Sequence, residues 1–163
     1  MEAHEHPTAH DLAMQWSAGG RDTELVELIT LLRRAATAVT AEPDRFLASH
    51  GLSRGQFDVL AALYRSGADQ RLTQAELADR MMVTPAGMKK RLDGLFERGI
   101  ITRSADEADA RRQLIALTAS GLHTVEAVLD GFFAAERAAV EHLSPADRRT
   151  LTRVLRRLVR ESR

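Results

Sequence analysis

Apolar residues recur with the spacing of an α-helix along most of the chain. This period covers residues 22–40, 53–65, 73–80, 84–99, 120–142 and 145–163. Between residues 100 and 118 the period changes, because two short segments, 100–104 and 113–117, flank a charged turn. The pattern predicts a mainly α protein with a small β-hairpin.

The starts of the predicted helices carry residues that satisfy free backbone N–H groups. Ser53 and Thr73 each begin a capping box, with Gln or Glu three residues further on. Thr84 caps the next helix, and Pro85 occupies its first position, where a missing N–H costs nothing. A short helix, a turn, a longer helix and a hairpin, in this order, are typical of a winged helix-turn-helix.

The longer of these two helices has a polar face suited to reading DNA. At about 100° per residue, Met88, Leu92 and Leu95 lie on one side, while Lys90 lies opposite them with Lys89 at its shoulder. The small residues of 85–87 would let the start of this helix approach phosphates and base edges. An ordinary amphipathic surface helix is the alternative interpretation.

Composition limits the class of protein. A chain of 163 residues with 44% hydrophobic residues can form one domain with a core, or a small domain together with dimerising helices. Its 23 acidic and 23 basic residues cancel, so a nucleic-acid site must come from a local excess, such as the surplus of three basic residues between Arg80 and Arg112. Because there is no cysteine, disulfides, cysteine-ligated zinc, iron-sulfur clusters and thiol redox sensing are excluded.

The chain has neither a long apolar run nor the pattern of a secretion signal, so we expect a cytoplasmic protein that does not bind membranes. Its six histidines have no neighbouring nucleophile or metal-ligand spacing, and His4, His6 and His10 belong to a polar N-terminal stretch. We therefore expect no enzyme activity, no cofactor and no metal site.

The segment LTQAELADRMMVTPAGMKKRLDGLFERGIITRSADEADARRQLIALTASG resembles the core of the MarR family of bacterial regulators. The resemblance rests on Leu72-Thr73, Glu76-Leu77-Ala78, Val83-Thr84, Arg91-Leu92 with Leu95, Arg98-Gly99, and Leu117-Thr118 before Gly121. It implies a DNA-binding transcription regulator, a repressor, with its winged helix-turn-helix at 53–118. Residues 21–50 and 119–163 would be dimerisation helices, and residues 1–20 an extension with a short helix carrying Trp16.

By the same resemblance, the homodimer would place two recognition helices about one turn apart on double-stranded DNA, at a pseudo-palindromic operator. The family's wing turn corresponds to Asp109, Ala110 and Arg111, so Arg111 would enter the minor groove, while alanine replaces its usual basic neighbour and Arg112 compensates. The DNA-contacting set is then Thr73, Gln74, Thr84, Pro85, Ala86, Gly87, Lys89, Lys90, Arg111 and Arg112. A winged helix that binds protein in place of DNA is the alternative.

Asp58 breaks the expected burial pattern. It is the only charged residue in the apolar stretch 57–64, so its carboxylate should be at least half buried and should need a partner. Arg91, on the flank of the buried stripe, could be that partner.

The set Trp16, Asp58, Arg91 and Arg103 resembles that of the urate-responsive, PecS-like branch of the family. This resemblance implies that a small purine-like anion, such as urate or xanthine, binds between two guanidinium groups under an indole and releases the DNA. Two alternatives stay open. One is a purely structural salt bridge from Asp58 to Arg91 or Arg103, with Trp16 in simple packing. The other is a phenolic or other small organic anion as the signal.

Overall fold

The computed structural model describes residues 7–66, 71–106, 109 and 112–161, with Ala18 described through its backbone alone. The chain forms two compact units. Residues 43–137 make up the winged-helix unit, and residues 1–42 with 138–163 make up the terminal unit. Helices α2 and α6 run from one unit into the other.

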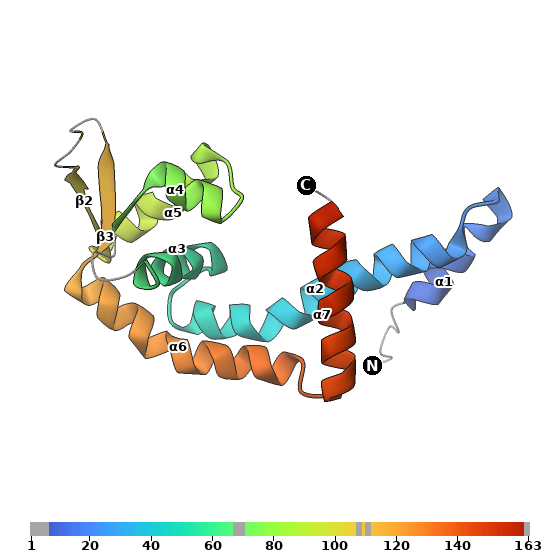
Figure 1. The fold of residues 1–163 in the computed structure, drawn as a ribbon. Coiled ribbons are helices and arrows are strands. Elements are labelled where there is room, and N and C mark those ends of the chain that lie inside the picture. Colours follow the sequence, from blue (N-terminus) through green and yellow to red (C-terminus); the bar gives the residue numbers. More distant parts are fainter. Residues whose placement is uncertain (1–6, 67–70, 107–108, 110–111, 162–163) are drawn as a thin grey trace, which may run out of the picture. The chain divides into compact units, whose positions relative to one another are not determined.

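The winged-helix unit holds the elements predicted for DNA reading (Figure 1). Its elements are the end of α2, then α3 (Arg54–Tyr64), β1 (Arg71–Thr73), α4 (Gln74–Arg80), α5 (Pro85–Glu97), β2 (Ile101–Ala105), β3 (Gln113–Leu117) and most of α6 (Ala119–Ala139). Both predicted capping boxes are present, and Thr84 caps α5 as expected. The fold class is therefore confirmed as a mainly α winged helix-turn-helix with a β wing.

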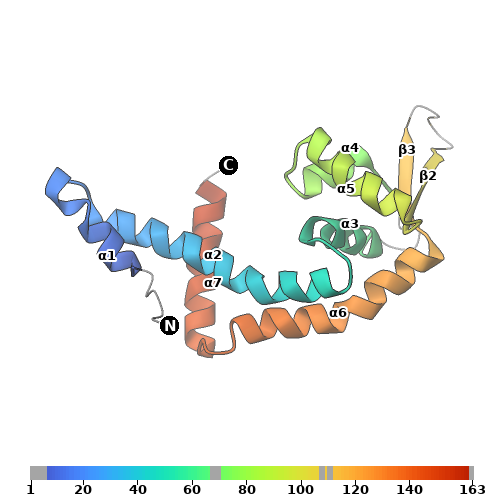
Figure 2. The same ribbon diagram turned by 180° about the vertical axis from the view of Figure 1, so that it is seen from behind.

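The sheet has one strand more than the sequence predicts. Strand β1 pairs with β3, so the antiparallel order is β1-β3-β2, with Leu72 opposite Ile115. Strand β1 escapes the hydrophobic pattern because it has only three residues and runs directly into the cap of α4. Strands β2 and β3 form the hairpin of the wing, which lies next to the C-terminal end of α5 (Figure 2).

Close helix packing organises the core of the winged-helix unit. Met88, Leu92 and Leu95 of α5 are fully buried, as the helix pattern predicts. They join a core formed by Leu60, Leu63, Leu72, Leu77, Ile100, Ile115, Val125 and Phe132. Gly55 of α3 leaves room for the Arg91 side chain, because a Cβ at this position would lie 2.7 Å from Nε of Arg91.

The terminal unit contains α1 (Ala9–Met14), the short 3₁₀ helix η1 (Ser17–Gly19), the first part of α2 (Thr23–Ser49) and α7 (Pro145–Glu161). Helix α1 is attached to α2: Ala9 and Ala13 are buried, and His10 Nδ1 lies 3.2 Å from Glu27 Oε2. The N-terminal extension thus contains a short helix, and Trp16 follows it with 58% of its surface exposed.

Helix α2 continues well past the predicted end near Thr40. It runs through Pro43 to Ser49, although proline lacks the N–H for a helical hydrogen bond. Both Pro43 and Leu47 are fully buried in the winged-helix unit, so tertiary packing outweighs the local preference. None of the helices in the described ranges combines the length and the apolar character that a membrane-spanning segment needs.

We expect Gly121→Ala to destabilise the protein by about 1–3 kcal/mol, the usual range for overpacking. A Cβ on Gly121 would collide with the backbone oxygen of Ile100, which a side-chain rotation cannot relieve. Thermal unfolding at matched protein concentration measures the effect. Gly19→Ala is the control, because a Cβ at Gly19 meets nothing within 4 Å. Equal melting temperatures for the two variants would contradict this packing.

Candidate functional site

Helix α5 presents the predicted polar face to solvent. Lys89 and Lys90 are both exposed, whereas Met88, directly before them, is fully buried. The two lysines differ in their surroundings. Lys89 Nζ lies 2.6 Å from Asp93 Oδ2, while no ion pair to Lys90 is found among the described residues. Lys90 is therefore the cation of α5 most available to a phosphate.

The start of α5 is held by contacts within the unit. The Thr84 hydroxyl accepts a hydrogen bond from the Gly87 N–H at 3.1 Å, and Gln74 Nε2 donates to the Pro85 carbonyl oxygen at 3.3 Å. Pro85 and Ala86 are exposed and small, so a DNA backbone can approach this end of the helix. Gln74 thereby connects the start of α4 to the start of α5.

Thr73 has the structural role of a helix cap, as the sequence predicts. The residue is buried, and both its backbone N–H and its hydroxyl donate to Glu76 Oε2, at 2.7 and 2.8 Å. These hydrogen bonds lower the pKa of the Glu76 carboxyl. The capping box therefore uses the side chain of Thr73, and its place in the DNA-contacting set stays a prediction.

Of the two wing arginines in the predicted DNA-contacting set, the structure describes Arg112 but not Arg111. Arg112 is half exposed, 3.6 Å from Glu76 Oε1 and 3.8 Å from Asp106 Oδ2, so it links the loop end of the hairpin β2–β3 to α4. Ala110 and Arg111 lie outside the described residues. The proposed insertion of Arg111 into the minor groove thus stays a prediction.

Asp58 is half-buried on α3, as the sequence predicts. Burial raises the pKa of the Asp58 carboxyl above its ordinary value, and the nearby charges of Arg54 and Arg91 offset this only in part. Within the described residues, no ion pair joins Asp58 to Arg91 or Arg103. The salt bridge considered as a structural alternative is therefore not formed.

Asp58 lies at the wall of a cavity of ≈ 450 Å³ in the winged-helix unit. Helices α3 and α6 and the end of α4 provide its walls, which combine aromatic faces with charged groups. The lining residues are Arg54, Phe57, Asp58, Ala61, Ala62, Arg65, Arg80, Met81, Leu129, Phe132, Phe133 and Glu136. This mixture of aromatic rings and guanidinium groups suits a flat, anionic molecule.

Arg54 is the most highly connected of the cavity residues that the sequence did not predict. Its Nε donates to Asp44 Oδ1 at 2.7 Å, its guanidinium lies 4.6 Å from the centre of the Phe132 ring, and one of its nitrogens is 3.5 Å from Glu136 Oε1. It therefore connects α2, α3 and α6 at the cavity. Its position four residues before Asp58 was the available signal, because such residues are neighbours on a helix.

The other three residues proposed with Asp58 lie in different surroundings. Arg91 rests against Gly55 and donates to the Met81 sulfur at 3.7 Å, directly beside the cavity wall. Arg103 lies on strand β2, with its guanidinium 4.4 Å from the centre of the Phe96 ring. Trp16 belongs to the terminal unit, where it lines a groove with Leu25 and Ile29.

Comparisons with known proteins agree on one class of protein. The model described as "MarR family" matches residues 50–112. The chain is 31% identical over 134 residues to the HTH-type transcriptional repressor YetL of Bacillus subtilis (strain 168), covering 82% of this chain and 80% of that protein. It is 25% identical over 150 residues to the HTH-type transcriptional regulator PecS of Dickeya dadantii (strain 3937), covering 91% and 90%.

Among solved structures, the chain is similar to Bordetella bronchiseptica BpsR, with a TM-score of 0.72 and 26% identity over 80% of this chain and 91% of that one. That structure concerns the regulation of BpsR DNA binding by 6-hydroxynicotinic acid. The similar proteins are regulators of transcription, which confirms the expectation that this chain is not an enzyme.

We expect Lys90→Ala to weaken DNA binding and Lys89→Ala to weaken it less. Lys90 is free of internal ion pairs among the described residues, whereas Lys89 is neutralised by Asp93. Fluorescence anisotropy with duplex DNA over a salt series checks this, and removing one phosphate-binding cation should lower the salt slope by about 0.9. An unchanged slope and affinity for Lys90→Ala would contradict the orientation of α5 on DNA.

We expect Asp58→Asn to raise the melting temperature at neutral pH and to lose this advantage in acid. A raised pKa means that ionised Asp58 disfavours the folded state, and that this penalty disappears as the pH falls through the folded pKa towards 3.8. The charged groups that act on it are Arg54, Arg91, Arg65 and Asp44. Melting curves of both proteins across this range test the sign. A lower melting temperature for Asp58→Asn at neutral pH would contradict it.

Proposed function

Because the chain belongs to the MarR family, we propose that it is a homodimeric repressor that leaves a pseudo-palindromic operator when it binds a small anionic, purine-like ligand such as urate or xanthine. DNA-binding transcription regulation follows from family membership itself, which also favours DNA over the alternative of a protein-binding winged helix. The dimer, the operator symmetry and the ligand are the proposed parts.

Exposed apolar side chains in the terminal unit support the dimer. Leu25, Leu28 and Ile29 of α2 are each at least 40% exposed. In α7 the exposed apolar residues are Leu151, Val154, Leu155, Leu158 and Val159. Patches of this kind are typical of surfaces that a partner covers. A second copy of the chain, as the family resemblance implies, would bury them and bring two α5 helices to one duplex.

The observation that carries the ligand proposal is the half-buried Asp58 carboxylate, without an ion pair among the described residues, at the wall of an aromatic cavity. A carboxylate accepts hydrogen bonds, and a purine such as urate or xanthine offers ring N–H donors. The cavity arginines Arg65 and Arg80, for which no ion pair is found among the described residues, would neutralise the anionic charge of the ligand. Arg54 is already paired with Asp44 and Glu136. Phe132 and Phe133 would cover its faces.

The cavity wall also offers a route from ligand to DNA. Met81 lines the cavity and accepts a hydrogen bond from Arg91 of α5, so movement of Met81 would be transmitted to the helix that carries Lys90. Arg103 stacks on Phe96 of the same helix. We therefore keep Asp58, Arg91 and Arg103 as the proposed ligand set and add Arg54 to it. Trp16, which belongs to the terminal unit, stays a prediction from the family resemblance.

A phenolic or other small organic anion is the second candidate for the signal. It is favoured by the similarity to BpsR, whose DNA binding is regulated by 6-hydroxynicotinic acid. The two classes differ in what they require of Asp58. A purine donates ring N–H groups to the Asp58 carboxylate, whereas a phenolic acid has only its hydroxyl to donate and brings a carboxylate that Asp58 repels.

DNA release decides between the two classes. The assay uses an operator selected by the purified protein from random DNA, with urate, xanthine, hypoxanthine and simple phenolic acids as ligands. We expect urate or xanthine to release the operator from the wild-type protein. For Asp58→Asn and for Arg103→Ala, release should need at least a tenfold higher ligand concentration, which corresponds to about 1.4 kcal/mol. Asp130→Asn, an exposed carboxylate outside the cavity lining, is the matched control.

Two results would overturn parts of this proposal. If phenolic acids release the DNA and Asp58→Asn strengthens their effect, the purine assignment is wrong and the second candidate holds. If Asp58→Asn and Arg103→Ala respond to purines as the control does, the proposed ligand set is wrong.

A further inference from the structure

Helix α7 carries a concentration of charge that the winged helix-turn-helix does not use. Its 17 residues include the arginines Arg148, Arg149, Arg153, Arg156, Arg157 and Arg160. Only Asp147 and Glu161 oppose them within the helix, although the chain as a whole is neutral. The remainder of the chain is therefore net acidic, and this helix is strongly basic.

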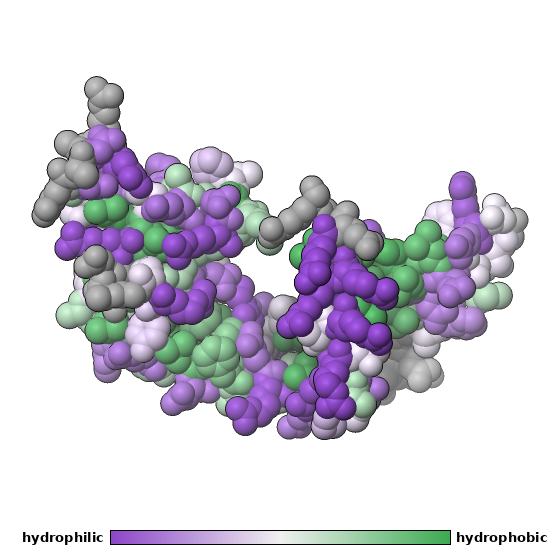
Figure 3. Space-filling view, viewed as in Figure 1, coloured by the Kyte–Doolittle hydropathy of each residue, from purple (hydrophilic) through white to green (hydrophobic). Residues whose placement is uncertain are grey.

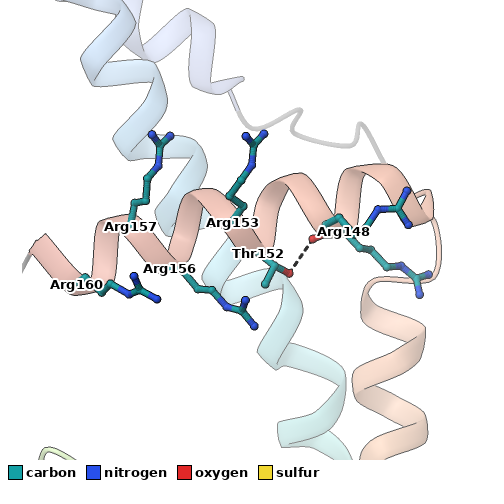
Figure 4. Close-up of a pocket in the computed structure, with 7 residues that line it drawn as sticks. Arg148, Thr152, Arg153, Arg156, Arg157 and Arg160 are labelled. Carbon is teal, nitrogen blue, oxygen red and sulfur yellow. Dashed lines mark hydrogen bonds between the residues drawn. The ribbon is translucent and has the colours of Figure 1, made fainter.

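The arginines and the apolar residues of α7 lie on opposite faces. At about 100° per residue, Arg149, Arg153, Arg156 and Arg160 fall within one arc of about 60°. The apolar residues, centred near Leu151 and Leu158, fall almost diametrically opposite. Figure 4 shows the arginines in two rows, Arg153 with Arg157 and Arg156 with Arg160. The hydrophilic surface over α7 in Figure 3 is continuous.

The opposite placement of the two faces of α7 determines which of them would stay exposed to solvent in a dimer. If the apolar face packs against a second copy, as proposed above, the arginine face points away from that contact. The arginines would then remain exposed in the dimer, and the twofold symmetry would provide two such surfaces. This step rests on the proposed dimer.

The arginines of this face are available for binding. Arg148 donates to the Leu143 and Glu141 carbonyl oxygens at 3.0 and 3.1 Å, which holds it at the start of the helix. Among the described residues, no carboxylate pairs with the other five arginines of α7. In the winged-helix unit, by contrast, Lys89 and Arg112 both have acidic partners.

We propose that the arginine face of α7 is a second nucleic-acid-binding surface, which binds backbone phosphates of duplex DNA without reading sequence. Guanidinium groups bind phosphate oxygens through paired, planar hydrogen bonds. Residues 149–160 rise by about 16 Å along the helix, which matches a row of phosphates better than one small anion. A shallow surface hollow of ≈ 570 Å³ between the side chains gives the backbone room to approach.

DNA fits this face better than an anionic membrane does. A helix that lies in a membrane surface buries its apolar face in the lipid while its cations contact the headgroups. In the proposed dimer the apolar face of α7 is covered by protein, so only the cations are left. A face of cations alone suits a polyanion.

The test compares the full-length wild type with Arg153→Gln/Arg156→Gln/Arg160→Gln on a duplex of arbitrary sequence, by fluorescence anisotropy over a salt series. We expect the salt slope of the variant to fall by about 0.9 for each phosphate that it no longer neutralises. Affinities for operator and arbitrary DNA should fall by the same factor, because phosphate contacts carry no sequence information. Arg153→Lys/Arg156→Lys/Arg160→Lys keeps the charge and should restore most of the slope.

The matched control is Arg21→Gln/Arg33→Gln/Arg137→Gln, which removes the same charge from exposed sites outside α7 and should retain the wild-type slope. Light scattering on every variant detects a failure of the proposed dimer separately. A wild-type slope and affinity for the α7 glutamine variant would overturn the proposal. So would loss of binding to phosphatidylglycerol vesicles with the DNA slope unchanged, because the surface would then serve a membrane.

Discussion

The close packing of α5 against α3 is the constraint on which the rest of the winged-helix unit depends. At this contact Gly55 leaves room for the Arg91 side chain, and Gly94 leaves room for the end of the Gln56 side chain. Met88, Leu92 and Leu95 are buried as a result. With one face of α5 committed to the core, the opposite face with Lys90 can only face solvent, where DNA can reach it.

The same packing places a carboxylate where its charge is costly. Asp58 lies on α3, beside Arg54 and near Arg91, and burial raises the pKa of its carboxyl, which the charges of the two arginines offset only in part. A carboxylate left in this state has unused hydrogen-bonding capacity towards the cavity. The cavity wall contacts α5 through Met81 and Arg91, so a ligand that satisfies Asp58 would also act on the helix that carries Lys90.

Both units contain an amphipathic helix, but the two helices differ in whether their own unit covers the apolar face. In the winged-helix unit, an amphipathic helix buries its apolar face within its own chain. In the terminal unit, α7 keeps its apolar face exposed and carries arginines on the other side. A helix of this kind gains stability when a partner covers the apolar face, and this leaves its charged face for a second interaction.

The sequence alone determined the features that depend on residues close together in the chain. The capping boxes at Ser53 and Thr73, the buried stripe of α5 and the half-burial of Asp58 follow from local spacing. Tertiary structure decided the rest: strand β1 needs β3 as its partner, and α2 continues through Pro43 because distant residues bury it. It also decided that Arg54 binds Asp44 and Glu136, residues brought together from three helices, and that Asp58 has no such partner among the described residues. Hydrogen bonds and charge pairs between distant segments depend on distances that only the folded chain defines.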